Sequence, residues 1–175
     1  SGGMQMFGSG FLPSTHQPST FLSSSPVLQN IVPREKELSY QRKKLHLLAE
    51  IDGKVLVRHV VEVAVQSAAA EIIVVTGHEA DLVRRALSGL DVRFVHNSQY
   101  PEGLSTSLRA GIGAVSEGLT GAVILLGDMP RVTPGIVDAL IGHFHAEKDA
   151  PICQPTYRGR AGNPVLWPRA FFPEI

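Results

Sequence analysis

The stretch over residues 121–130 constrains the fold of this chain more than any other. It contains five consecutive apolar residues, 122–126, which predict a strand buried on both faces, as in a parallel sheet covered by helices. Gly127 and Asp128 follow directly, so a carboxylate lies at the carboxyl end of this strand. Open α/β sheets bind their ligands outside that edge. Asp128 is therefore either a ligand-binding residue or an ordinary turn residue.

Strands and helices alternate along most of the chain. Buried extended runs are predicted at residues 71–77 and 121–126, and an alternating strand at 91–96. Helix-like apolar spacing occurs at 56–68, 79–87, 104–115 and 134–145. Thr133 and Pro134 provide an N-cap hydroxyl and a first-turn proline for the last helix. Gly53 marks a tight turn with Asp52. We therefore predict an α/β fold with a Rossmann-like, doubly wound and mostly parallel sheet.

The balanced charge and the cysteine count of the chain argue against several classes of partner and against a disulfide-bonded fold. The chain has 175 residues, the size of one domain, with 16 basic and 16 acidic residues. This balance argues against a nucleic-acid or membrane-surface partner, and no apolar run has the length of a membrane span. The single cysteine, Cys153, excludes an intrachain disulfide and suits a reducing compartment. No secretory signal is recognised, so we expect a cytoplasmic protein.

The N-terminal region differs from everything after it. Residues 1–34 are rich in Ser, Pro, Gly and Thr and show no hydrophobic period, and residues 1–3 resemble a tag scar. We predict a poorly ordered, irregular arm over 1–34 and one domain over 35–175, which opens with a charged, helix-prone run to residue 50. The Gly-Ser-Gly at 8–10 does not qualify as a phosphate loop, because no buried strand precedes it and no helix follows it.

Four loops are predicted at the carboxyl ends of strands, where they would converge on one face of the sheet. They are residues 76–79, 97–103, 127–130 and 158–163. The second loop opens a helix at Gly103, followed by three hydroxyl residues, so free N–H groups would face an anion; Ser105 is equally well an ordinary helix residue. In the fourth loop, two glycines flank Arg160, a bidentate phosphate donor, although a flexible hairpin turn explains the same pattern.

These residues resemble a known family. From about Leu47 to Ile175 the chain is similar to the molybdenum cofactor cytidylyltransferases, within the MobA-like nucleotidyltransferases. The matching motifs are LLAEIDGK at 47–54, VTGHE at 75–79, EGLSTSLRAG at 102–111, GDMP at 127–130 and GRAGNPVL at 159–166. The resemblance implies a sheet of the nucleotide-diphospho-sugar transferase type. It also implies transfer of CMP from Mg²⁺-bound CTP to the phosphate of molybdopterin, with release of pyrophosphate.

The resemblance further implies partners and residue roles. CTP is expected rather than GTP, and the product is expected to pass to a molybdenum hydroxylase. Asp128 matches the family's metal-binding aspartate and is the expected catalytic residue. The expected substrate-binding residues are Thr76, Gly77, His78, Gly103, Ser105, Ser107, Arg109, Arg160, Gly162 and Asn163. The expected nucleotide-binding residues are Lys44, His46 and Gly127.

The chain departs from the family pattern at both ends. Members begin with a strand and a glycine-rich loop, LAAGxSxRMG, that wraps the triphosphate, and nothing upstream of Leu47 matches it. Residues 6–30 read like a segment of an unrelated protein, which leaves a chimeric gene model open. Relatives also continue past the position of Ile175. We therefore predict an atypical or missing first strand and weak activity. A non-catalytic pterin- or nucleotide-binding module, or a family-related oxidoreductase, stays open as an alternative.

Overall fold

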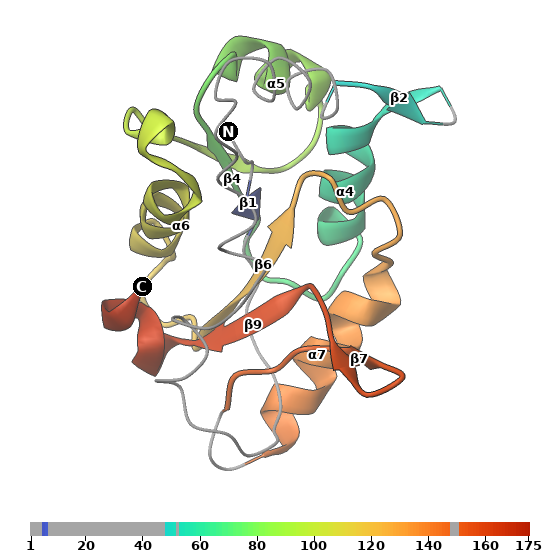
Figure 1. Cartoon of the computed structure of the whole chain (residues 1–175), viewed down its shortest axis with the longest axis vertical. Helices are drawn as coiled ribbons and strands as arrows, with labels where there is room; N and C mark the ends of the chain where they lie inside the picture. The colour runs from blue at the N-terminus through green and yellow to red at the C-terminus, as the bar shows by residue number, and fades with distance from the viewer. Residues whose placement is uncertain (1–4, 7–47, 52, 148–150) are drawn as a thin grey trace.

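Figure 1 shows the computed structural model, which describes residues 5–6, 48–51, 53–147 and 151–175. The main body begins with a hairpin of β2 (Glu50–Ile51) and β3 (Lys54–Val55), whose turn includes Gly53 at a φ of 76°. The predicted turn is therefore confirmed. Glu50, at the end of the helix-prone run, lies in a strand, while the rest of that run before residue 48 lies outside the described residues.

The sheet combines parallel and antiparallel pairs. β4 (Ile73–Thr76) and β5 (Arg93–His96) pair in parallel, as the sequence predicts. β6 (Gly121–Leu126) pairs antiparallel with β9 (Val165–Pro168), and Leu166 of β9 also forms a bridge with Cys153. The short strand β1 (Gln5–Met6) pairs with β6 and also contacts β4, so it lies between them (Figure 1). β4 and β5 form one ladder and β1, β6 and β9 another, and the contact of β1 with β4 places the strands in the order β5, β4, β1, β6, β9.

β1 is the part of the predicted N-terminal arm that the structure describes. Gln5 pairs with Leu126 and Met6 with Leu125, so β1 runs antiparallel to the carboxyl-terminal end of β6. A strand therefore lies beside β6 ahead of the residues that resemble the family, and it runs antiparallel to β6. The remaining residues of the arm lie outside the described part of the chain, so its predicted irregularity stays a prediction.

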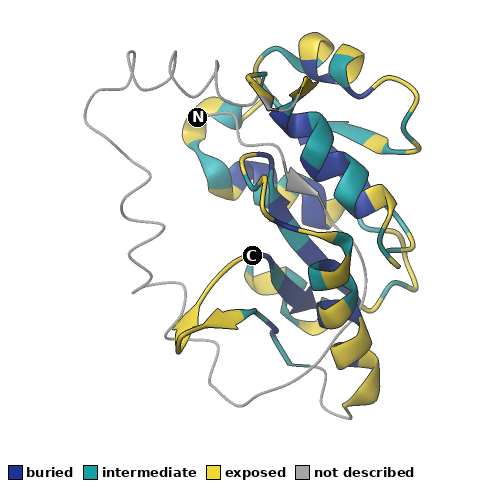
Figure 2. Ribbon diagram, turned by 90° about the vertical axis from the view of Figure 1, so that its right-hand side faces the viewer, coloured by how far each residue is buried: buried dark blue, intermediate teal, exposed yellow. Residues whose placement is uncertain are grey.

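The central strands are buried on both faces because helices cover both sides of the sheet (Figure 2). On one side, Val74 of β4 and Val123 of β6 share a core with α4 (Leu56–Val65), α5 (Ala80–Ala86) and α7 (Pro134–Ala146). On the other side, Ile73 and Ala122 pack with Ile112 of α6 (Leu104–Gly113). Alternate residues of each strand thus enter opposite cores, which is the arrangement that a doubly wound fold requires.

Two helix ends show how local and distant contacts set the boundaries. α7 begins as predicted, because the Thr133 hydroxyl accepts a hydrogen bond from the Ile136 N–H at 3.4 Å. The predicted helix over 56–68 was too long, since α4 ends at Val65. Beyond it, the Ala68 N–H donates to the Asp138 carboxylate of α7 at 2.7 Å instead of continuing the helix.

No helix in the described ranges has the length and apolar character needed to cross a membrane.

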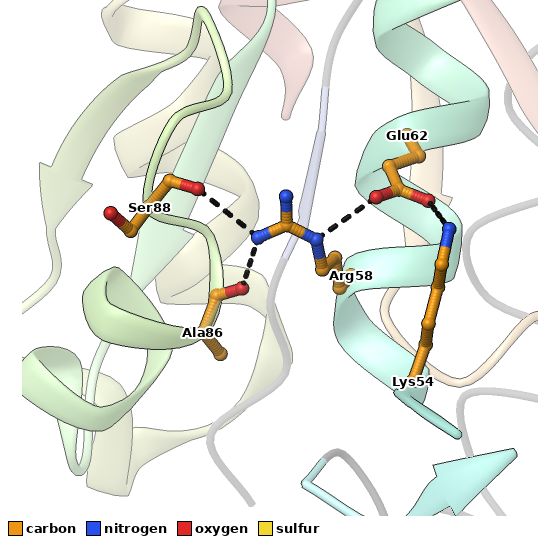
Figure 3. Close-up of polar contacts among 5 residues, drawn as sticks. All are labelled: Lys54, Arg58, Glu62, Ala86 and Ser88. Carbon is orange, nitrogen blue, oxygen red and sulfur yellow. Dashed lines mark hydrogen bonds and ion pairs between the residues drawn. The ribbon is translucent and has the colours of Figure 1, made fainter.

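Arg58 of α4 joins that helix to the end of α5 (Figure 3). Its guanidinium donates to the carbonyls of Ala86 at 2.9 Å and Ser88 at 3.1 Å, and its Nε donates to Glu62 at 2.9 Å. Lys54 also bonds to Glu62 at 2.9 Å, and this bond, aided by Arg58, holds the pKa of the Glu62 carboxyl below its usual value. Arg58 therefore satisfies carbonyls that α5 leaves unpaired where it ends.

We expect Arg58→Met to lower the free energy of unfolding by about 2 kcal/mol, because hydrogen bonds from a charged donor to the half-buried Ala86 carbonyl and the exposed Ser88 carbonyl are lost. Urea denaturation would measure the change. Lys54→Met is the matched control; its side chain is 52% exposed, and its ion pair should contribute less than about 1 kcal/mol. Equal losses in the two variants would contradict the role assigned to Arg58.

Candidate functional site

Three of the four predicted loops follow the carboxyl ends of β4, β5 and β6. We call residues 76–79, 97–103 and 127–130 the carboxyl edge. The first two loops begin side by side, because the Asn97 N–H donates to the Thr76 carbonyl at 2.7 Å where β4 and β5 end. The third follows β6 directly, with Gly127 buried and Asp128 exposed. This is the edge at which open α/β sheets bind ligands.

Asp128 is exposed and not engaged in the fold. Within the described residues, its carboxylate makes no hydrogen bond or ion pair, and Thr133 rather than Asp128 caps α7. The described part of the chain also contains no cluster of three or more His, Cys, Asp or Glu able to hold a metal ion. A single carboxylate fits a Mg²⁺ ion whose other ligands are water and phosphate oxygens, rather than an ion held in a protein cage.

The loop after β4 contains three predicted substrate-binding residues with different surroundings. Thr76 is buried, and its hydroxyl donates to the Val95 carbonyl of β5 at 3.4 Å, so the side chain faces the sheet. Gly77 lies against Tyr100, and a Cβ at position 77 would lie 2.5 Å from the Tyr100 Cβ. His78 is partly exposed, and its Nδ1 lies 3.4 Å from the Tyr100 hydroxyl. The sequence did not single out Tyr100.

Asn97 organises the loop after β5 from within. Its side chain is buried, and its amide donates to the hydroxyls of Thr106 at 2.9 Å and Ser107 at 3.0 Å. Its side-chain carbonyl accepts from the Gln99 N–H at 3.0 Å. In this conformation the Ser107 hydroxyl is committed to Asn97 and is not exposed at the carboxyl edge. The signal that the sequence analysis missed is a carboxamide directly after the strand β5, followed after a short loop by two hydroxyl residues in the first turn of a helix.

α6 begins after a glycine and, among the described residues, without a side-chain cap, as the sequence predicts. Gly103 precedes the helix at a φ of 124°, and no side-chain hydrogen bond caps this end in the described structure. Ser105 is exposed in the first turn. Arg109 is also exposed, and its Nε donates to the Ile175 carbonyl oxygen at 3.0 Å, so the side chain turns toward η3 (Arg169–Glu174) and Ile175. Free N–H groups at such a helix start are suited to a phosphate.

The fourth loop differs from its predicted position. Residues 158–163 do not leave the carboxyl end of a sheet strand; they include the tip of a separate hairpin formed by β7 (Thr156–Tyr157) and β8 (Arg160–Ala161). Arg158 and Gly159 form the turn at φ values of 51° and 74°, as two-residue hairpins require. The chain then enters β9 antiparallel to β6.

The remaining predicted residues fall into two groups. Arg160, Gly162 and Asn163 are exposed on or just after β8. Lys44 and His46 lie outside the described residues.

Cys153 is buried, and desolvation raises the pKa of its thiol to about 12, so it stays protonated and is not a nucleophile near neutral pH.

Comparison with known proteins places this geometry among nucleotidyltransferases. A family model described as the MobA-like NTP transferase domain matches residues 42–175. A solved nucleotidyl transferase from Methanothermobacter thermautotroptrophicus shares 28% identity with a TM-score of 0.64, over 74% of this chain and 61% of that chain. Rv0371c from Mycobacterium tuberculosis H37Rv, solved in complex with manganese, shares 28% identity with a TM-score of 0.58, over 74% of this chain and 67% of that chain. These similarities confirm the predicted fold class.

Curated relatives match over a smaller part of their length. The bifunctional protein GlmU of Albidiferax ferrireducens is 33% identical over an alignment of 131 residues that covers 67% of this chain and 27% of that protein. The GlmU of Chromohalobacter salexigens is 35% identical over 103 residues, or 59% of this chain and 21% of that protein. The chain thus spans about a quarter of the length of these relatives.

We expect Asp128→Asn to abolish Mg²⁺-dependent binding of a nucleoside triphosphate, because the neutral amide is a much weaker metal ligand than the carboxylate. Thermal unfolding with and without Mg²⁺ and a nucleoside triphosphate would measure it. The stability of the free protein should change by less than about 0.5 kcal/mol, as for an exposed residue without partners. Glu117→Gln, which removes an exposed carboxylate elsewhere, is the control. A loss of more than about 2 kcal/mol in Asp128→Asn would instead identify a structural turn or cap residue.

Proposed function

Because the chain belongs to the MobA-like NTP transferase domain family, we propose that it transfers CMP from CTP to the phosphate of molybdopterin. The observation that carries this proposal is the exposed Asp128 carboxylate directly after β6, which has no partner among the described residues. In the reaction, a phosphate oxygen of the acceptor attacks the α-phosphorus of CTP. The bond between the α-phosphorus and the bridging oxygen breaks, and pyrophosphate leaves with the electron pair.

Some residues of the chain would neutralise the charge of the phosphates, and others would hold the phosphates in position. Asp128 would hold Mg²⁺, which when bound neutralises charge on the phosphates. The uncapped start of α6 at Gly103 and the exposed Ser105 offer N–H and hydroxyl donors to a phosphate group. The buried Asn97 amide fixes that helix end against β5, so these donors need little rearrangement on binding.

Roles for the other predicted residues belong to the same proposal. The backbone at Gly77 and Gly127, the imidazole of His78 and the exposed Arg109 are proposed to contact substrate from the carboxyl edge. Arg160, Gly162 and Asn163 are proposed to bind the acceptor from the β7–β8 hairpin, and Lys44 and His46 to bind the nucleotide. A molybdenum hydroxylase is the proposed recipient of the product.

A sugar phosphate is the second candidate acceptor. The chain matches the GlmU proteins over part of their length, and its fold is of the nucleotide-diphospho-sugar transferase type. The chemistry at the α-phosphorus would be the same, and the acceptor would differ only in what carries the attacking phosphate. The two candidate functions therefore differ in the acceptor molecule and share the same reaction at the α-phosphorus.

We propose further that turnover is slow. No glycine-rich loop of the family type precedes Leu47, and β1 runs antiparallel to β6, so it does not lead into a loop at the carboxyl edge. Phosphoryl-type transfer depends on positioned donors and charge neutralisation rather than on covalent help from the protein. Losing a single preorganised donor can lower the rate by about 10²- to 10³-fold, and a whole triphosphate cradle contributes more.

The test is pyrophosphate release with Mg²⁺ and either CTP, GTP or UTP, offered with molybdenum-loaded molybdopterin or with a sugar 1-phosphate. We expect slow release that requires CTP and molybdopterin and that Asp128→Asn abolishes. A version carrying a family-type first strand and glycine-rich loop should be faster by at least about 10²-fold. Release that depends on the sugar phosphate would favour the second acceptor. Equal turnover of the natural and grafted chains would contradict the proposed loss of the triphosphate cradle.

A further inference from the structure

Tyr100 lies directly on the backbone of Gly77. A Cβ added to Gly77 would lie 2.5 Å from the Cβ and 2.7 Å from the Cγ of Tyr100, which is closer than such atoms approach in proteins. The φ of Gly77 lies outside the left-handed region, so its backbone conformation alone does not require glycine. The glycine is required here because the tyrosine side chain occupies the space where a Cβ would be.

The backbone of Tyr100 is held in place from the side of β5 and α6. Tyr100 begins the short 3-10 helix η2 (Tyr100–Glu102), and its N–H donates to the Asn97 carbonyl at 3.4 Å. Its own carbonyl accepts from the Gly103 N–H at 3.3 Å, immediately before α6. The buried Asn97 side chain in turn bonds to two hydroxyls of α6. Tyr100 is therefore attached to the same frame that fixes the start of α6.

The Tyr100 ring also contacts the next residue of the β4 loop. Its hydroxyl lies 3.4 Å from the His78 Nδ1, and the two ring centroids are 5.8 Å apart with planes tilted by 50°. On the other side of the imidazole, Nε2 lies 3.8 Å from the carboxylate of Glu79, the residue that precedes α5. Tyr100 thus touches the β4 loop twice, at the backbone of Gly77 and at the imidazole of His78.

We propose that Tyr100 is a positioning residue that locks the loop after β4 to the loop after β5. His78 and the start of α6 would then face the substrate as one unit, with their relative position set before binding. This role rests on the proposed function, because it assumes that both loops contact a phosphorylated substrate. Preorganisation of this kind lowers the free-energy cost of binding and orientation.

A double-mutant cycle tests the lock. Gly77→Ala, Tyr100→Gly and the double variant should be compared by the KM for acceptor and by kcat, since only glycine at position 100 removes the Cβ that a side chain at position 77 would meet. Each single substitution should raise the KM about tenfold, and the double variant should show little further loss, because residues that share one contact are not additive. Gly113→Ala is the matched control, since a Cβ there meets nothing within 4 Å. Independent, additive effects of the two substitutions would overturn the proposal.

A second measurement needs no turnover and separates this inference from the proposed function. In the free protein, ¹⁵N NMR of the imidazole reports the tautomer and the hydrogen bonding of His78. Tyr100→Phe keeps the ring and removes the hydroxyl, so we expect it to shift the His78 nitrogen resonances while thermal unfolding stays nearly unchanged. Gly77→Ala should shift them as well, and Gly113→Ala should not. If His78 does not respond to either substitution, the lock is absent, whatever the enzyme assays show. If His78 responds but no substrate is turned over, the lock stands and the proposed function fails.

Discussion

Burial of β4 and β6 on both faces is the constraint from which the rest of this structure follows. Val74 and Val123 enter one core, and Ile73 and Ala122 enter the other, so each strand needs helices on both sides of the sheet. Polar side chains with free groups have no place within such strands, since burying them without partners is costly. They collect where the strands end, and the carboxyl edge with Asp128 is therefore a consequence of how the sheet is covered.

The fold was predictable where the determining signal is local. The apolar run of β6 and the capping by Thr133 lie within a few residues of the elements that they define, and both agree with the structure. The end of α4 was predicted too late, because the bond that replaces the helical one comes from Asp138, far along the chain. The direction of β9 was missed for the same reason, since it depends on pairing with β6.

The candidate site divides in the same way. The position of Asp128 and the start of α6 at Gly103 could be predicted, because each follows a strong strand or begins a strong helix. The burial of Ser107 could not, because it depends on how α6 is rotated against the Asn97 side chain. Tyr100 was missed because its contact with Gly77 joins loops from two different strands. A glycine directly after a buried strand is the one signal for such a contact in the sequence.

The direction of β1 connects the architecture to the proposed chemistry. A strand that feeds a loop at the carboxyl edge must run parallel to β6, and β1 runs antiparallel, pairing only with Leu125 and Leu126. Among the described residues, the donors at that edge therefore come from the loops after β4 and β5, and the negative charge that can hold a metal comes from Asp128. Such an edge can recognise a single phosphate more readily than it can enclose a triphosphate, because enclosure requires donors on several sides. In the proposed function, substrate recognition and turnover would thus be separable, and recognition would depend on loops whose relative position Tyr100 is proposed to fix.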